Sequence, residues 1–319
     1  MDTTMHAVRG HRRGGPEVLV YEVAPRPVPG DGEVLVEVRS ASITPDELTW
    51  DATWTDRLDP GGEPRLPAIP AKEVSGVVVA AGPGADREGD PAVGDKVFGL
   101  IPFNRDGAAA EFTAVPAAAL APKPAGLGFD EAAALTLAGL TAWQGLVRHG
   151  GLREGGRVLV HGAAGGVGSL AVQIAVALGA EVIGTAGADH LDFVRGLGAA
   201  RALDYRAERF EDVVDEVDVV FDTAGGDTQQ RSWQVLRNSG VLVSIVSPPQ
   251  REGGDGHGPR GAFFVVEPDR DGLVELTRLV DAGRLTVPVD QVVPLSGAAA
   301  AYAALEKRGR RGKVVLRVA

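Results

Sequence analysis

A short run in the middle of the chain, residues 158–184, constrains the fold more than any other segment. It opens with Val158–Val160, an apolar stretch of the kind that forms a buried parallel strand. A glycine-rich turn follows, and then Leu170, Ile174 and Leu178 recur four apart, which gives a helix one apolar face. A second β-rich stretch comes directly after the helix. The order predicts a strand–turn–helix–strand unit.

The turn between the first strand and the helix carries the strongest functional signal. Its pattern is Ala163-x-Gly165-x-x-Gly168, with alanine in place of the first glycine of a G-x-G-x-x-G motif. Glycine lets the backbone approach a pyrophosphate, whose charge is stabilised at the helix N-terminus. The alternative is a turn that only helps the helix pack on the sheet, but the strand–turn–helix setting favours a dinucleotide site. We predict cofactor contacts from the loop at Ala164, Gly165, Gly166, Val167 and Gly168.

The second half of the chain repeats the alternation of strand and helix. Strands are expected at 158–160, 181–185, 200–204, 217–222, 241–246 and 263–266. Helices are expected at 129–148 with a turn at 138–141, and at 190–197, 210–216, 228–237, 273–282 and 298–305, before a closing strand at 313–318. Such alternation is typical of an α/β fold with a doubly wound parallel sheet.

Residues 1–122 have a different pattern. Short β-rich stretches at 18–23, 33–42, 74–81 and 109–115 are separated by Gly/Pro turns. Short strands without long helices between them predict an antiparallel, barrel-like domain. The Ala/Pro-rich segment 117–124 is the expected boundary between this region and the next.

Charge and composition narrow the function. The net charge is −11, and the basic run Lys307–Arg311 is expected to be a solvated turn. Nucleic acid is not an expected partner, because phosphate binding needs a basic face. No apolar run is long enough to span a membrane, and no basic segment followed by an apolar one occurs near the N-terminus. We therefore expect no membrane contact and a cytoplasmic location.

Five segments, taken together and in their order, resemble the medium-chain dehydrogenase/reductase superfamily, and within it the zinc-independent quinone oxidoreductase and enoyl reductase-like branch. They are Glu33–Val38, Gly94–Gly99, Ala138–Trp143, Gly162–Gly168 and Gly312–Leu316. The resemblance implies a GroES-like β-barrel catalytic domain split between 1–124 and 266–319, a Rossmann dinucleotide-binding domain at 125–265, and an active site in the cleft. It also implies a homodimer that pairs edge strands, for which the apolar stretch 263–266 is suited.

The zinc ligands of metal-dependent relatives have no counterpart in this chain. In our alignment they fall on Thr44, Lys72 and Ala138, none of which is a thiolate, imidazole or carboxylate, and the chain has no cysteine. We therefore expect no metal and no alcohol oxidation by Lewis-acid chemistry. Glu47 and Glu73 are possible ligands in principle, but an ion pair with a nearby Arg or Lys is the favoured role for Glu73.

The segment after the second nucleotide-domain strand indicates which dinucleotide binds. An NAD site has an acid there for the ribose hydroxyls, but residues 184–187 of this chain are Gly-Thr-Ala-Gly. The missing carboxylate removes a charge that would repel a 2′-phosphate, so NADPH is the predicted cofactor. His190 and Tyr205 are candidates for that phosphate; the alternatives are a solvated helix start and a strand-end aromatic. Further cofactor contacts are predicted, mostly from the resemblance, at Thr141, Thr185, Gly187, Ala224, Ser247, Phe264 and Lys313.

The catalytic candidates come from the resemblance, which puts Thr44, Trp50, Trp54 and Lys72 near the cleft. The cofactor supplies hydride, and reduction of a conjugated C=C bond then needs a proton on the α-carbon. Lys72 is the candidate to polarise a carbonyl, with a surface or ion-paired lysine as the alternative. The two tryptophans would either wall a flat apolar substrate or pack in the core.

The predicted function is hydride transfer from NADPH to a small molecule, either a quinone or an α,β-unsaturated carbonyl reduced at its C=C bond. Two alternatives stay open at this point. One is a dedicated enoyl reductase of a biosynthetic pathway, and the other is a non-catalytic dinucleotide-binding redox sensor.

Overall fold

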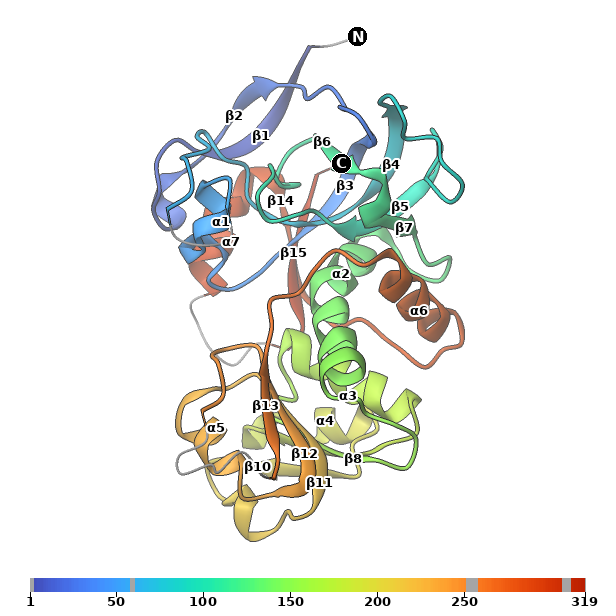
Figure 1. Ribbon diagram of the computed structural model, residues 1–319. Helices are drawn as coiled ribbons and strands as arrows, with labels where there is room; N and C mark the ends of the chain where they lie inside the picture. The colour runs from blue at the N-terminus through green and yellow to red at the C-terminus, as the bar shows by residue number, and fades with distance from the viewer. Residues whose placement is uncertain (1–2, 58–60, 251–257, 306–310, 319) are drawn as a thin grey trace. The chain divides into compact units, whose positions relative to one another are not determined.

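The computed structural model describes residues 3–57, 61–250, 258–305 and 311–318. By compactness the chain divides into two units (Figure 1). Unit 1 comprises Met1–Leu137, Glu267–Asp281 and Val287–Ala319, and unit 2 comprises Ala138–Val266 and Ala282–Thr286. Both ends of the chain thus contribute to unit 1. The bounds 1–124, 125–265 and 266–319 stay a prediction, and the basic run 307–311 lies almost wholly outside the described residues.

Unit 2 is built on a parallel sheet. Its described strands are β8 (Arg157–Val160), β9 (Glu181–Ala186), β10 (Arg201–Asp204), β11 (Val217–Asp222), β12 (Leu236–Ser244) and β13 (Arg260–Phe263). They are all parallel, in the order β10-β9-β8-β11-β12-β13. The order of connection reverses between β8 and β11, and the carboxyl ends of strands at such a point are where these sheets bind ligands. The predicted doubly wound sheet is confirmed.

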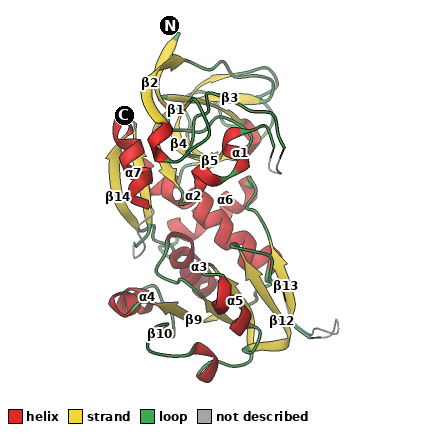
Figure 2. Cartoon of the chain, turned by 90° about the vertical axis from the view of Figure 1, so that its left-hand side faces the viewer, coloured by secondary structure: helices red, strands yellow, loops and turns green. Residues whose placement is uncertain are grey.

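Aligned apolar side chains form the core of unit 2. Leu159, Val220 and Leu242 lie opposite one another on neighbouring strands and are fully buried. Helices α3 (Gly166–Ala177) and α4 (Leu191–Gly196) pack against β8, β9 and β10, and α5 (Gly226–Ser232) packs against β12 (Figure 2). Full burial of each such side chain is worth about 1.5–3 kcal/mol, which fixes the strand ends that carry the functional loops.

Unit 1 contains two sheets. Its described strands are β1 (Thr4–Gly10), β2 (Leu19–Pro25), β3 (Glu33–Ile43), β4 (Glu73–Ala81), β5 (Lys96–Leu100), β6 (Phe112–Pro116), β7 (Leu120–Pro122), β14 (Val289–Pro294) and β15 (Lys313–Arg317). β1 and β2 form an antiparallel pair, and the others form one sheet around β3. β15 pairs antiparallel with the end of β3, from Val314 opposite Ile43 to Arg317 opposite Ser40. This pairing is what brings the C-terminal segment into the N-terminal, GroES-like part.

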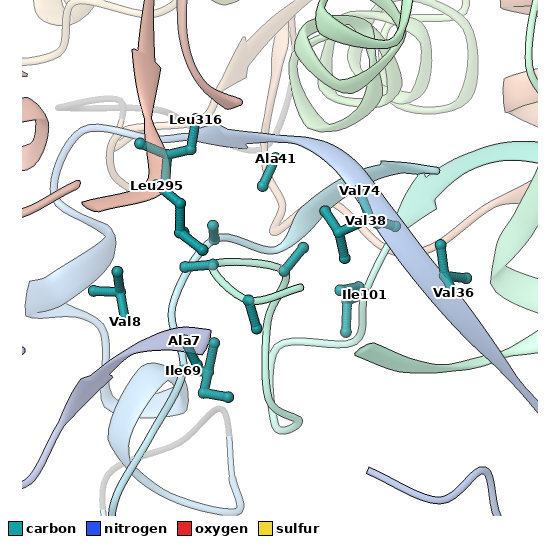
Figure 3. Packing of buried hydrophobic residues seen from close by; sticks show 14 of the residues in the cluster. Ala7, Val8, Val36, Val38, Ala41, Ile69, Val74, Ile101, Leu295 and Leu316 are labelled. Atoms are coloured by element: carbon teal, nitrogen blue, oxygen red, sulfur yellow. The ribbon is translucent and has the colours of Figure 1, made fainter. Parts of the chain in front are cut away.

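The core of unit 1 is assembled from distant segments. Figure 3 shows Ala41 of β3 between Leu316 of β15 and Val74 of β4, with Val38 beside Val74, and all of these side chains are buried. The helices of unit 1 are α1 (Asp51–Trp54), α6 (Arg270–Asp281) and α7 (Ala298–Leu305); α2 (Phe129–Trp143) begins in unit 1 and ends in unit 2. Among the described residues, no helix combines the length and the apolar character that crossing a membrane would require.

Two local expectations at turns are wrong. The turn expected at 138–141 is absent, because α2 runs unbroken to Trp143 and continues as a π-helical turn at Gln144–His149. Its residues from Ala132 to Ala142 are almost all buried, and this packing outweighs the helix-breaking tendency of Gly139. The last strand of the parallel sheet is Arg260–Phe263 rather than 263–266, because its partner β12 ends at Ser244, opposite Phe263.

Two helices are shorter than the sequence pattern suggests. The stretch 210–216 forms a 3₁₀ turn at Phe210–Asp212 only. The helix expected at 228–237 is α5, which ends at Ser232 because the chain must enter β12 at Leu236. In the second place the pairing of the next parallel strand takes residues 236–237, which a helical period alone would assign to the helix.

Candidate functional site

The glycine loop of unit 2 lies at the carboxyl end of β8. Gly162 has φ +68° and Gly165 donates its N–H to the Gly162 carbonyl at 2.9 Å, which closes a tight turn. α3 begins directly after Gly165, whose extended conformation and missing side chain leave the helix start without a side-chain cap. The first backbone N–H groups of a helix have no partner within it. They therefore point outward at a position that suits a phosphate.

Two glycines of this loop have different surroundings. A Cβ on Gly168 would lie 2.1 Å from the Gly162 carbonyl oxygen, so the loop and the helix approach too closely for any side chain. A Cβ on Gly165 would meet only that same oxygen, at 3.3 Å. Gly168 is thus needed for the turn itself, whereas the space beside Gly165 is open for a ligand. The residues present fit a pyrophosphate, to which the amides of Gly166, Val167 and Gly168 would donate.

His161, the residue before this loop, is held in place by two buried hydrogen bonds. Its ring is buried between Thr185 Oγ1, 3.0 Å from Nδ1, and Ser232 Oγ, 2.9 Å from Nε2. Since Ser232 donates its own hydrogen to the Thr228 carbonyl, Nε2 carries the imidazole proton and Nδ1 accepts from Thr185. Burial lowers the pKa of His161 to about 4. The hydroxyl hydrogen of Thr185 is therefore used inside unit 2, and its predicted cofactor contact stays a prediction.

A second buried polar group holds the loops after β11 and β12. The Asp222 carboxylate accepts the N–H groups of Ala224 and Gly225, both at 2.9 Å, and the Ser244 hydroxyl at 2.9 Å. The Gln229 amide reaches Asp222 and also the carbonyl of Ser247 at 3.1 Å. Ala224 and Ser247, two predicted cofactor residues, are thus tied to the same carboxylate at neighbouring strand ends.

Gly187, Tyr205 and Arg206 form a cluster at the ends of β9 and β10, where an adenosine 2′-phosphate is expected. A Cβ on Gly187 would lie 3.1 Å from Arg206 Nη1 and 4.0 Å from the Tyr205 ring. The Arg206 guanidinium lies 4.8 Å from the centre of the Tyr205 ring, and both side chains are exposed. His190 is half-buried in the 3₁₀ turn that follows Gly187. Arg206 adds a cation that the sequence analysis did not single out.

The remaining predicted cofactor residues come from several elements of the two units. Thr141 is buried within α2, and Phe264 follows β13 and stacks on His149 with the ring centres 4.3 Å apart. Ala164 is buried in the glycine loop. Lys313 lies in unit 1, at the start of β15. The contacts of these residues with a cofactor stay predictions.

Unit 1 contains a buried ion pair with a threonine attached. Lys313 Nζ donates to Glu73 Oε1 at 2.6 Å and to Thr44 Oγ1 at 2.9 Å, and Thr44 donates to Glu73 Oε1 at 3.0 Å. The other Glu73 oxygen accepts the Leu137 N–H at 3.0 Å. The side chains of Glu73 and Lys313 are 1% and 7% exposed. The ion pair predicted for Glu73 is confirmed.

A second buried carboxylate, Glu47, lies three residues after Thr44 in the sequence and has partners of its own. Glu47 accepts the Tyr302 hydroxyl at 2.9 Å and the Ala71 N–H at 2.7 Å. Burial raises the pKa of Glu47, and the positive charge of Lys72 partly offsets this rise. Burial and the nearby Glu47 carboxylate raise the pKa of Tyr302 well above its usual value. Burial also lowers the pKa of Lys72 to about 8.

Lys72 is not the surface lysine that the sequence allowed. Its residue is 1% exposed, and Nζ donates to the Arg105 carbonyl. A substrate carbonyl would reach this ammonium only after the surrounding chain moved, so its catalytic role stays a prediction. Trp50 is half-buried, with its ring edge-on to Phe103 at 5.5 Å, whereas Trp54 is 2% exposed and belongs to the core.

The donor atoms at the aligned metal positions do not fit zinc. Thr44 Oγ1 is bound to Glu73 and Lys313, Lys72 is a cation, and Ala138 offers no side-chain donor. Throughout the described part of the chain, no three His, Cys, Asp or Glu side chains come together as a metal site would need. The residues at these positions therefore do not form a zinc site.

A doubly wound sheet with an open glycine loop, combined with a split antiparallel unit, defines a dinucleotide-binding oxidoreductase class. Residues 30–125 match the family model described as an alcohol dehydrogenase GroES-like domain, and residues 197–316 match one described as a zinc-binding dehydrogenase. The chain is 34% identical over 319 residues to a probable zinc-binding oxidoreductase, mitochondrial, of Arthroderma benhamiae, covering 94% of this chain and 93% of that protein.

Two further similarities agree with this class. An NADPH-dependent alkenal/one oxidoreductase, chloroplastic, of Arabidopsis thaliana is 34% identical over 299 residues, covering 90% of this chain and 72% of that protein. The structure of the quinone oxidoreductase from Coxiella burnetii matches with a TM-score of 0.87 and 30% identity, covering 99% of this chain and 100% of that one. The chain belongs to the medium-chain dehydrogenase/reductase superfamily, among the quinone and alkenal oxidoreductases, which confirms the family and the fold class predicted from the sequence.

Proposed function

We propose that this protein is a zinc-independent, NADPH-dependent oxidoreductase that transfers hydride to a quinone or to the C=C bond of an α,β-unsaturated carbonyl. The observation that carries the proposal is Thr44, at the aligned position of a zinc ligand, bound to the buried Lys313–Glu73 pair. Without a metal, the usual means of activating an alcohol is missing. Acceptors that conjugation already polarises are therefore favoured.

The preference for NADPH rests on the end of β9. No carboxylate is present at 184–187, and the Arg206 guanidinium lies beside Gly187 with the Tyr205 ring against it. An arginine donates to phosphate in a planar, charge-assisted geometry, whereas a ribose hydroxyl gains less from it. The name of the Arabidopsis relative, which specifies NADPH, supports the same choice.

The roles of the residues follow from this assignment. When bound, NADPH supplies hydride from its dihydronicotinamide ring. The glycine loop would bind the pyrophosphate through backbone amides, and Ala224 and Ser247 would line the nucleotide at strand ends held by Asp222. Thr44 would contact the substrate, and Trp50 would flank it. The cytoplasmic location also stays a prediction, since the names of relatives include mitochondrial and chloroplastic proteins.

One experiment tests the function. The purified protein is dialysed against a strong chelator, its zinc content is measured, and NADPH oxidation is followed with a quinone, an enone, an enal and simple alcohols plus NADP⁺. We expect turnover with conjugated acceptors, and we expect the rate of NADPH oxidation to be the same after chelation. Stoichiometric zinc with chelator-sensitive alcohol oxidation would contradict the proposal. NADPH binding without turnover on any acceptor would favour a redox sensor instead.

We also propose a homodimer. β13 is the last strand in the sheet order of unit 2, and Phe263 at its end is 42% exposed. No described strand pairs with the outer edge of β13, and such an edge of a parallel sheet is suited to pairing with the same edge of a second copy. Light scattering at micromolar concentration is expected to give the mass of two chains, and a monomer there would contradict this proposal.

A further inference from the structure

Thr44 is half-buried, and its hydroxyl is hydrogen-bonded to the buried ion pair of Lys313 and Glu73. Lys313 Nζ lies 2.9 Å from Thr44 Oγ1 and 2.6 Å from Glu73 Oε1, so all three polar groups meet in one small cluster. Burying two charges costs several kcal/mol each before their attraction repays it. A cluster that only held strands together would be at least as stable with apolar residues, so this one calls for a functional reason.

The backbone around the cluster is also unusual. Among the described residues with a side chain, three have positive φ, and two of these lie beside the cluster: Asp46 at +62°, two residues after Thr44, and Ala71 at +67°, two residues before Glu73. Such conformations cost of order 1–3 kcal/mol for a residue with a Cβ, and they gather where function fixes the geometry. Strain and buried charge therefore coincide at one half-buried hydroxyl.

The hydrogen-bond donors can be counted. Lys313 directs one N–H at Glu73 and another at the Thr44 oxygen, and Glu73 uses its other oxygen to accept the Leu137 N–H. The Thr44 hydrogen points to Glu73 in this arrangement. Rotation about the Cβ–Oγ bond would turn that hydrogen away from Glu73 without disturbing the N–H that Lys313 directs at the same oxygen. The hydroxyl then has an acid directly behind it.

We propose that Lys313 and Thr44 form a proton relay to the α-carbon of the reduced substrate, with Glu73 as the positioning residue. This rests on the proposed function. Hydride from NADPH forms the new C–H bond at the β-carbon, and the π electrons move to give an enolate. The α-carbon takes the proton from Thr44 Oγ as that O–H bond breaks. Thr44 takes a proton from Lys313 Nζ, and the resulting amine is reprotonated from solvent.

The relay predicts a difference between two acceptors of the same enzyme. An enone needs a proton on carbon, which a positioned acid accelerates by about 10²–10⁴-fold. A quinone needs protons only on oxygen, which water supplies. Thr44→Val has nearly the same shape and no hydroxyl, so we expect it to slow cyclohex-2-enone reduction by about 10²-fold and to slow p-benzoquinone reduction far less. Thr44→Ser, which restores the hydroxyl, is the matched control and is expected to recover the enone rate.

Deuterium labelling gives a readout that damage to the fold would not imitate. With 3-methylcyclohex-2-enone in D₂O, the wild type is expected to place deuterium on one face of the α-carbon, cis or trans to the methyl group, as read by NMR of the product. Thr44→Val is expected to lose that facial preference. Because Lys313→Met alone leaves a buried carboxylate unpaired, the second variant is Lys313→Met/Glu73→Gln, which removes both charges together and is expected to behave as Thr44→Val does.

The outcomes separate the relay from the proposed function. If Thr44→Val retains the enone rate and the α-face preference, or slows both acceptors equally, the relay is overturned while hydride transfer stands. If the wild type reduces the quinone but no enone, the relay is also overturned. If the wild type reduces neither acceptor, the proposed function fails and the relay fails with it.

Discussion

The two candidate site regions are built in opposite ways. The nucleotide loop of unit 2, Gly162–Gly168, is one contiguous stretch that offers backbone amides and free space and contains no charged side chain. The cluster in unit 1 joins Thr44, Glu73 and Lys313, with Glu73 and Lys313 separated by 240 residues, and it consists of charges buried from water. The proposed role of the loop requires free space beside its glycines, whereas the proposed role of the cluster requires three interacting side chains.

This difference determines how each region responds to substitution. A site made of backbone amides tolerates substitutions of the surrounding residues but not added side-chain volume at its glycines. A buried ion pair tolerates the joint removal of both charges far better than the removal of one, because a lone buried charge has lost its compensation.

The largest effect is expected from breaking the buried pair. Lys313→Met leaves the Glu73 carboxylate, 1% exposed, without its cation, and is expected to lower the free energy of unfolding by about 3–5 kcal/mol. Lys313→Met/Glu73→Gln is expected to lose much less, since the amide still accepts the Leu137 N–H. Urea unfolding of the three proteins measures this. Equal losses for the single and the double variant would show that the two charges are not coupled.

The contrast also explains what the sequence alone predicted. The parallel sheet and its glycine turn could be predicted from local period and spacing, because strand, turn and helix are consecutive. The Thr44–Glu73–Lys313 cluster has no local signal: it exists because β15 pairs with the end of β3. Sequence reasoning named its members one by one, with Lys313 as a cofactor residue, and did not connect them.

Two other site residues were missed for related reasons. Tyr302 is the one polar side chain in the alanine-rich helix α7, and its partner Glu47 is 255 residues away. Arg206 directly follows Tyr205, but its approach to Gly187 depends on β10 lying beside β9. A lone tyrosine in an alanine run and a cation at a strand end were the available signals. Neither identifies its partner without the tertiary fold.

The second prediction concerns added volume in the loop. Gly165→Val fits the extended backbone at that residue and meets only the Gly162 oxygen at 3.3 Å, so the fold should persist. The new side chain fills the space for the pyrophosphate, and losing its charge-assisted hydrogen bonds is expected to weaken NADPH binding by about 10²-fold or more and to abolish turnover.

Gly168→Val is the contrasting variant at the same loop. Its Cβ would lie 2.1 Å from the Gly162 oxygen, so the free energy of unfolding itself is expected to fall, by about 3 kcal/mol. Fluorescence titration with NADPH and thermal unfolding separate the two effects. If Gly165→Val bound NADPH as the wild type does, the loop would not be the pyrophosphate site.

The third prediction tests whether unit 2 also depends on a buried titratable group. His161 faces Asp222, Arg231 and Glu211, and its pKa is lowered to about 4 from 6.5. The unfolded chain binds a proton there below pH 6.5 and the folded chain does not, so this contribution to stability is complete above pH 6.5 and is lost as the pH falls toward 4. Between pH 7 and 4.5 it amounts to roughly 2–3 kcal/mol.

The matched variant isolates this residue from the carboxylates that also titrate. His161→Gln does not titrate, so its deficit in unfolding free energy relative to the wild type is expected to shrink between pH 7 and pH 4.5. Chemical unfolding of both proteins at the two pH values measures the deficit. A deficit that is constant with pH would mean that the buried imidazole does not stay neutral.

The smallest effect is expected at Arg206 of unit 2, an exposed charged side chain next to a backbone glycine. Arg206 borders the backbone at Gly187 but is itself exposed to solvent, which weakens its interactions. Arg206→Ala is expected to weaken NADPH binding by about tenfold and leave NADH binding unchanged, because only NADPH carries the 2′-phosphate. Gly187→Asp, at an ordinary extended φ of −76°, is expected to shift the preference toward NADH, since its carboxylate would pair with Arg206 and repel the phosphate. Titration of both cofactors measures the ratio; if the two substitutions change NADPH and NADH affinity alike, the 2′-phosphate does not bind here, and the cofactor preference must be set elsewhere in the nucleotide unit.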